Sequence, residues 1–202
     1  MLGLPTSTQL HRPLYKTDIY KKFGLSGQEQ KRYDEFISHI YIENEISERS
    51  TKIAPGENIK AFFVLSVLMK KVDYDKKILE KLSKLIPQKM LILVECNNLA
   101  SIAVFEGGVL MQTEPAKIST IQLPLIASNL DQLWSNIVSY IGNFKVEEGA
   151  DLKKTIEQNE EKRKIKEKIE ALKKKAFKET QMRRKWELMA EAKKLELKLN
   201  AK

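Results

Sequence analysis

The sequence predicts an α+β fold: a compact mixed-sheet domain flanked by helices, followed by a long basic C-terminal helix. Short β-prone runs alternate with helical periods up to about residue 150, and 42% of the 202 residues are hydrophobic, which is enough to bury one core. Residues 151–202 contain 18 Lys or Arg against 10 Asp or Glu, a net charge of +8, whereas the preceding residues contain 18 against 17, a net of +1. We therefore expect a domain over residues 1–149 and a charged helical appendage over residues 150–202.

Two helices are predicted to open the domain. The first covers Thr17–Phe23 and ends at Gly24, the residue type expected just after a helix. The second begins at Ser26, which has Glu29 at the spacing of a capping box. Its apolar residues recur at i, i+3, i+4 and i+7, and they are Tyr33, Phe36, Ile37 and Ile40.

Two strands and a crossover helix are expected next. The segments Tyr41–Ile46 and Ile59–Met69 are rich in β-prone residues, and the second is apolar enough to be fully buried. Residues Asp75–Ile86 place Ile and Leu on one helical face and Lys on the other, and Pro87 marks the end of this helix.

The rest of the domain is predicted to be a hairpin, further strands and one more helix. Met90–Cys96 and Leu99–Phe105 read as strands joined at Asn97 and Asn98, which tolerate the left-handed backbone of a tight turn. Additional strands are expected at residues 109–112 and 117–123, and an amphipathic helix at residues 130–141, capped by Ser128 or Asn129. The predicted order is therefore α, α, β, β, α, β, β, β, α.

The C-terminal segment Asp151–Leu199 contains no Gly or Pro and is dominated by strong helix formers. Its apolar seam keeps spacings of three and four in two stretches, which are Ile165, Ile169, Leu172 and Ala176, and Leu188, Ala192, Leu195 and Leu199. Between these stretches, Phe177, Met182, Trp186 and Met189 shift the phase. A coiled coil and a helical hairpin both fit this pattern, and so narrow a seam needs a partner surface for stability.

Several classes of protein are excluded or disfavoured. Cys96 is the sole cysteine, so a disulfide within the chain is impossible and a reducing compartment is expected. The sequence shows no secretory signal and no apolar run long enough for a bilayer, so we expect a cytoplasmic protein without membrane contact. His11 and His39 have no further ligand at zinc spacing, and Gly107–Gly108 lacks the Lys and Ser or Thr of a phosphate loop. We expect neither a metal nor a cofactor.

One enzyme class survives as an alternative, a Mg²⁺-dependent nuclease of restriction type. Its weak candidates are Glu43, Glu45, Glu57 and Lys70, because such a core needs an acidic residue and an acidic-x-Lys pair on neighbouring strands. The strand before Lys70 contains Ser66 and no carboxylate, which leaves the metal without its central ligand. The simpler interpretation of Glu43 and Glu45 is an exposed strand face with both side chains on one side.

The basic tail provides the other functional signal. Its clusters are candidates for binding the phosphate backbone of a nucleic acid, and they are Lys162, Arg163, Lys164, Lys173, Lys174, Lys175, Arg183, Arg184 and Lys185. The competing interpretation is a solvated helix in which interleaved Glu residues balance the cations. For a protein partner, the candidate interface residues are Phe177, Trp186, Met189 and Leu195.

A set of segments is distinctive in combination: Met1–Thr8, Ile42–Ile46, Phe63–Leu65, Lys70–Asp75, Leu85–Leu91 and Asn129–Trp134. Together they resemble the bacterial family catalogued as domain of unknown function 4391, over essentially the whole chain. The resemblance implies a context, because genes of such proteins tend to lie beside DNA methyltransferase and helicase genes of restriction or phage-defence loci. It carries no catalytic motif.

We therefore expect a non-catalytic accessory protein, DNA-associated, that works with a restriction or phage-defence helicase or methyltransferase. Its partner would be a protein or a second copy of the chain, bound through the C-terminal helix, with DNA as a further contact. The Mg²⁺-dependent nuclease and a self-associating coiled-coil module are the alternatives.

Overall fold

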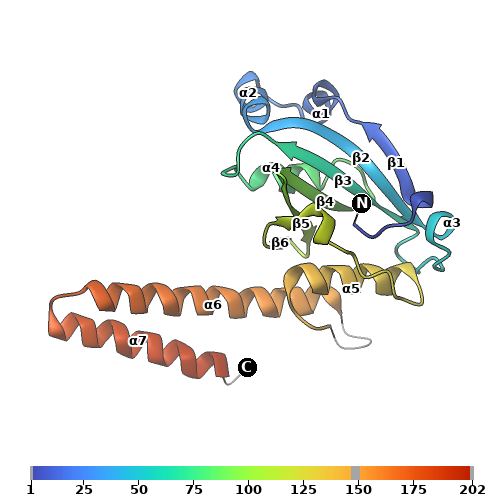
Figure 1. Ribbon diagram of the computed structural model, residues 1–202. Helices are drawn as coiled ribbons and strands as arrows, with labels where there is room; N and C mark the ends of the chain where they lie inside the picture. The colour runs from blue at the N-terminus through green and yellow to red at the C-terminus, as the bar shows by residue number, and fades with distance from the viewer. Residues whose placement is uncertain (1, 147–150, 201–202) are drawn as a thin grey trace. The chain divides into compact units, whose positions relative to one another are not determined.

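The computed structural model describes residues 2–146 and 151–200 (Figure 1). The chain divides into two compact units, Met1–Glu148 and Gly149–Lys202. The predicted boundary residue, Gly149, lies outside the described residues. Each unit has an apolar cluster of its own, so each unit has its own hydrophobic core.

A seven-stranded mixed sheet forms the centre of the first unit. Its strands are β1 Gln9–Pro13, β2 Ile37–Ser47, β3 Ala61–Met69, β4 Lys89–Cys96, β5 Leu99–Glu106, β6 Val109–Gln112 and β7 Ala116–Lys117. The spatial order is β1-β2-β3-β4-β5-β6, and β7 pairs with β5. Strands β3 and β4 are parallel, and the crossover between them contains the helix α4, Lys77–Leu82. The other described pairs are antiparallel.

Helices cover both faces of this sheet (Figure 1). The other helices of the first unit are α1 Lys16–Phe23, α2 Gly27–Phe36, α3 Glu48–Thr51 and α5 Leu130–Gly142, with 3₁₀ turns at Thr6–Thr8 and Ile118–Thr120. Helices α1, α2 and α4 bury Ile19, Tyr33 and Leu79 in one cluster with Leu65 and Ile92 of the sheet. Alternate residues of a strand face opposite sides, so Phe62, which packs against Trp134 of α5, belongs to the other face.

Local signals in the sequence account for most of these elements. Gly24 ends α1 with a left-handed φ of 58°, and the capping box of Ser26 and Glu29 begins α2. Asn129 caps α5 by accepting a hydrogen bond from the backbone of Gln132. The turn between β4 and β5 has positive φ at Asn97 and Asn98. The predicted α+β fold is confirmed.

Other boundaries differ from the prediction. Helix α2 ends at Phe36, so Ile37 and Ile40 lie in β2, where an irregularity between Ile37 and His39 lets both side chains face the core. The predicted order opens on a helix, whereas the strand β1, which contains His11, precedes it. The strand predicted at residues 117–123 contributes only Lys117 to the sheet. Its apolar residues Ile121 and Leu123 are buried outside the ladder instead.

Two buried tyrosines of the first unit differ in whether the hydroxyl forms a hydrogen bond, so removing each hydroxyl tests what that bond contributes to stability. Tyr20 and Tyr33 pack edge to face with ring centroids 6.0 Å apart. Tyr20 Oη donates to Asp34 Oδ1 at 2.8 Å, whereas Tyr33 Oη has no hydrogen-bond partner within the described part of the chain. We expect Tyr20→Phe to lower the free energy of unfolding by about 1.5–3 kcal/mol, since it removes a hydrogen bond to a charged group. Tyr33→Phe should not destabilise, and urea unfolding of both variants checks the difference.

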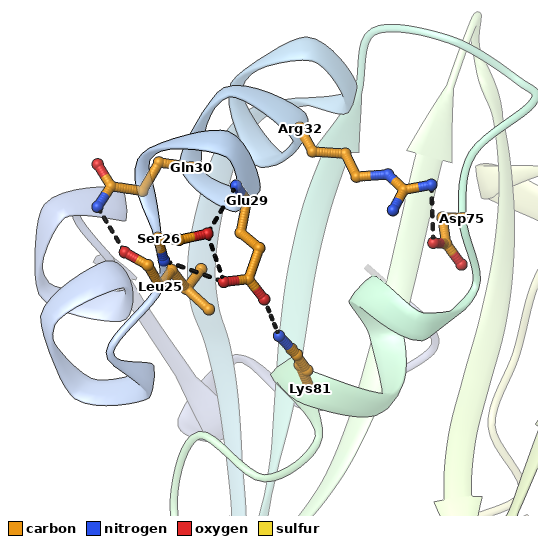
Figure 2. A network of polar contacts seen from close by, with 7 residues as sticks. All are labelled: Leu25, Ser26, Glu29, Gln30, Arg32, Asp75 and Lys81. Carbon is orange, nitrogen blue, oxygen red and sulfur yellow. Dashed lines mark hydrogen bonds and ion pairs between the residues drawn. The ribbon is translucent and has the colours of Figure 1, made fainter.

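Polar contacts also join α2 to the crossover segment around α4 (Figure 2). Glu29 Oε2 accepts from the backbone and hydroxyl of Ser26, and Lys81 of α4 donates to Glu29 Oε1 at 2.8 Å. Arg32 forms an ion pair with Asp75 at 3.4 Å. The contacts of Glu29 with Lys81 and Ser26, of which the hydrogen bond from Lys81 has the largest effect, lower the pKa of Glu29 from 4.5 to about 2.

The lowered pKa of Glu29 makes its stabilising effect dependent on pH. Because the folded-state pKa lies below that of the unfolded chain, the contribution is complete above about pH 4.5 and is lost as the pH falls toward 2. The difference in unfolding free energy between the natural chain and Glu29→Gln should therefore narrow on acidification. Urea unfolding at a series of pH values measures it. In a Lys81→Gln background the same substitution should show a weaker pH dependence, and an equal one would contradict this cause.

Candidate functional site: a partner-binding surface

The second unit is a helical hairpin, one of the two arrangements that the sequence pattern left open. Helix α6, Leu152–Lys178, and helix α7, Met182–Asn200, run back alongside each other (Figure 1). The turn contains no Gly or Pro; Glu179 Oε1 accepts hydrogen bonds from the backbone of Thr180 and Gln181 and so satisfies two free donors. At the other end of α6, Asp151 accepts from the backbone of Lys153 and Lys154.

The apolar seam holds the two helices of the hairpin together. Ile169, Leu172 and Ala192 are buried in it, and four further residues are partly buried against them: Ile165, Leu188, Leu195 and Leu199. Leu195, predicted at a partner interface, therefore belongs to the intramolecular seam, because its spacing of three and four from Ala192 and Leu199 points it toward α6.

Ion pairs flank the seam across the two helices. Lys168 lies 3.2 Å from Glu191, and Lys173 lies 2.8 Å from Glu196. The hydrogen bond to Glu196 raises the pKa of Lys173. Such exposed pairs contribute little to stability individually, but they fix which faces of α6 and α7 meet.

An apolar stripe remains exposed on α7. It consists of Met182, Trp186, Met189 and Leu197, which we call the α7 stripe; their side chains are 66%, 70%, 44% and 64% exposed. Spacings of four, three and eight keep these residues on one face of a helix. Phe177, at the end of α6, is 87% exposed. The predicted interface residues Phe177, Trp186 and Met189 thus all lie on the surface of the hairpin.

Two members of the α7 stripe, Met182 and Leu197, are not among the predicted interface residues. Their spacing from Trp186 and Met189 places them on the same helical face and could have identified them. In the sequence, however, Leu197 lies between the seam residues Leu195 and Leu199. Only the position of α6 shows which face of α7 belongs to the seam and which is exposed.

The nine cations predicted to contact nucleic acid fall into two groups. Five are in ion pairs with Glu residues of the hairpin, and these are Arg163, Lys164, Lys173, Arg183 and Arg184. Four are in no ion pair within residues 151–200: Lys162, Lys174, Lys175 and Lys185. The interleaved carboxylates therefore already neutralise more than half of the candidate surface.

The candidate nuclease residues do not converge. Glu45 pairs with Phe63 near one end of β3, while Lys70 follows Met69 at the other end. Phe63 and Met69 are six residues, or roughly 20 Å, apart along the strand. The Lys70 ammonium donates to the backbone carbonyl of Asp34. Glu57 is exposed in the loop before β3. Within the described residues no three acidic, His or Cys side chains form a group that could hold a metal ion.

Glu43 and Glu45 also do not share one face of β2 as predicted. The register shifts between Ile42 and Asn44, so the extra residue Glu43 breaks the alternation. Its carboxylate lies 3.0 Å from His11 Nδ1, and the His11 ring stacks on Tyr41 at a centroid distance of 4.9 Å. His39 lies 6.3 Å from the same Tyr41 ring.

The fold and this surface define a class: an α+β protein with a mixed sheet and a C-terminal helical hairpin that presents an exposed apolar and cationic face. Among the described helices none is long and apolar enough to cross a membrane. The family model of DUF4391, a domain of unknown function, matches residues 2–199, and the chain belongs to this family. No curated protein and no solved structure matches the chain.

Proposed function

We propose that this chain is a non-catalytic accessory protein that binds another protein through the α7 stripe. The observation that supports this function is the exposure of Trp186, Met182 and Met189 on one helical face that the seam does not use. Aromatic and Met side chains are enriched at protein interfaces, and an amphipathic helix docks through anchors at this spacing.

The charges around the α7 stripe favour a partner surface of opposite charge. On a helix of 3.6 residues per turn, Lys194 borders the stripe on one side and Lys185 on the other, while Lys193 lies within it. A complementary partner surface has an apolar strip edged by carboxylates. The family resemblance supplies the candidates for this partner, a helicase or methyltransferase of a restriction or phage-defence system.

A designed peptide tests the proposed surface without knowledge of the natural partner. The probe is a fluorescent helical peptide of about 21 residues, with Leu at a and d positions and Glu at the flanking positions. The control is a scrambled peptide of the same composition. The full chain should bind the amphipathic peptide at least about tenfold more tightly than the scrambled one, and Trp186→Ser should remove at least about tenfold of this affinity.

The matched control variant is Ile126→Ser, which changes an apolar residue that is 87% exposed in the first unit. Binding should be unchanged in this variant. Equal binding of both peptides, or equal effects of the two substitutions, would overturn the proposal. A dimer in sedimentation that Trp186→Ser dissolves would overturn it in favour of the self-associating module.

Association with DNA is a second candidate, and the four lysines outside ion pairs support it. Lys174 and Lys175 are exposed near the end of α6 and free to meet phosphates. Each phosphate contact contributes about −0.9 to the slope of log affinity against log salt. A salt titration with duplex DNA should therefore show a slope about 1.8 shallower for the double variant Lys174→Gln and Lys175→Gln. The same slope in both chains would exclude this surface.

A further inference from the structure

A pocket of the first unit, outside the hairpin, has the size and the polar lining of a ligand site. It lies beside the carboxyl end of β4, between the segment that leaves β3 and the segment that follows β6, and has a volume of about 420 Å³. This volume falls within the range of sites for small molecules, roughly 300–1,000 Å³. Such crevices at the carboxyl ends of parallel strands are frequent ligand sites in sheets with crossovers.

Three polar side chains are already organised in this pocket. Gln112 Nε2 donates one hydrogen bond to Tyr74 Oη and one to Ser101 Oγ, both at 2.7 Å. Tyr74 accepts in this contact, so it keeps its own proton for donation. Gln112 Oε1 has no partner within the described part of the chain and is not sealed from solvent. Tyr74 Oη is thus a donor, and the amide of its hydrogen-bond partner Gln112 carries an acceptor, Oε1. Burial, which raises the pKa of Tyr74, keeps this donor protonated.

The remaining lining sets the other properties of a ligand. Val72 and Leu99 are apolar residues at the rim and are 67% and 45% exposed. The rim also contains Asp73 and Glu114 against a single cation, Lys76. This net negative rim repels an anion such as a phosphate. It does not repel an uncharged, partly apolar molecule.

We propose that this pocket binds a small uncharged molecule that carries a lactam or secondary-amide edge, the size of a nucleobase. Its carbonyl oxygen accepts from Tyr74 and its adjacent N–H donates to Gln112 Oε1, while its ring covers the apolar wall near Val94 and Leu99. The site is independent of the α7 stripe, so either proposal can fail alone.

The single cysteine of the chain provides a local reporter. Cys96 is a partly buried free thiol that lines the pocket. With uracil as the probe, alkylation of Cys96 by iodoacetamide should slow in a saturable way at millimolar uracil. Acetate should give no protection, and 1,3-dimethyluracil, which lacks the N–H, should protect at least about threefold more weakly.

Tyr74→Phe should weaken protection by uracil about threefold to tenfold, because it removes one hydrogen bond and keeps the ring. Tyr140→Phe, an exposed tyrosine outside this pocket, is the matched control and should leave protection unchanged. Absence of protection by uracil, or equal protection by its dimethyl derivative, would overturn the proposal even if the Tyr74 variant failed to fold.

Discussion

Replacing Trp134 by alanine is expected to lower the free energy of unfolding by about 3–5 kcal/mol. The indole is 2% exposed and packs edge to face on Phe62 of β3 with centroids 5.2 Å apart. Its Nε1 donates to Glu106 Oε2 at 2.9 Å. The substitution therefore creates a cavity between α5 and the sheet and removes a hydrogen bond to a charged group.

Trp134→Phe separates these two contributions. It retains most of the apolar contact with Phe62 and removes the hydrogen bond to Glu106, which stays paired with Lys89 at 2.6 Å. We expect a loss of about 1–3 kcal/mol for this variant. Urea unfolding measures both, with Tyr140→Ala, on the exposed side of the same helix, as control. A loss below about 1 kcal/mol for Trp134→Ala would contradict the place of α5 in the core.

The helix ends and the turn that are determined by residues close to them in the sequence could be predicted from the sequence. A capping box at Ser26, a cap at Asn129 and an Asn pair at the turn each act within four residues, so the signal and the structure coincide. Strand β1 had no such signal: all its residues are exposed, and only pairing with β2 defines it. A prediction from hydrophobic period cannot detect a strand without a buried face.

The end of α2 illustrates a different limit. Ile37 and Ile40 are three residues apart, a spacing typical of a helix, yet both lie in a strand. The irregularity after Ile37 adds one residue to the alternation, so a strand with a bulge imitates the helical period. The same physics separates Glu43 from Glu45. Distinguishing these cases requires knowledge of the neighbouring strand, which the local sequence does not contain.

The candidate site was predicted in part, because its chemistry is local and its geometry is not. The clustering of cations and the aromatic residues Phe177 and Trp186 could be read directly from the sequence. Which cations would be neutralised depended on the hairpin, since Lys173 pairs with Glu196 of the other helix. The turn also escaped detection, because Glu179 stabilises it by side-chain hydrogen bonds where a glycine would be the usual signal.

Ile169→Asp is expected to open the hairpin, while Phe177→Asp on the same helix leaves it intact. Ile169 is 4% exposed in the seam, whereas Phe177 is 87% exposed. Burying an unpaired carboxylate costs several kcal/mol, which exceeds the stability that a narrow two-helix seam provides. An introduced carboxylate is therefore expected to open the hairpin at position 169 and to leave it folded at position 177, eight residues further along α6.

Amide hydrogen exchange of the full chain checks this pair. In Ile169→Asp, the amides of α7 should exchange at least about 100-fold faster than in the natural chain, with the amides of β4 and β5 as reference. Phe177→Asp should leave α7 protected. Both variants also test the proposed binding of a partner, because the residues of the α7 stripe lie on one face only while α7 is a helix. If Ile169→Asp loses the amphipathic peptide together with α7 protection, binding depends on the folded hairpin; if it still binds, the exposed apolar residues act without that geometry and the proposed docking surface is wrong.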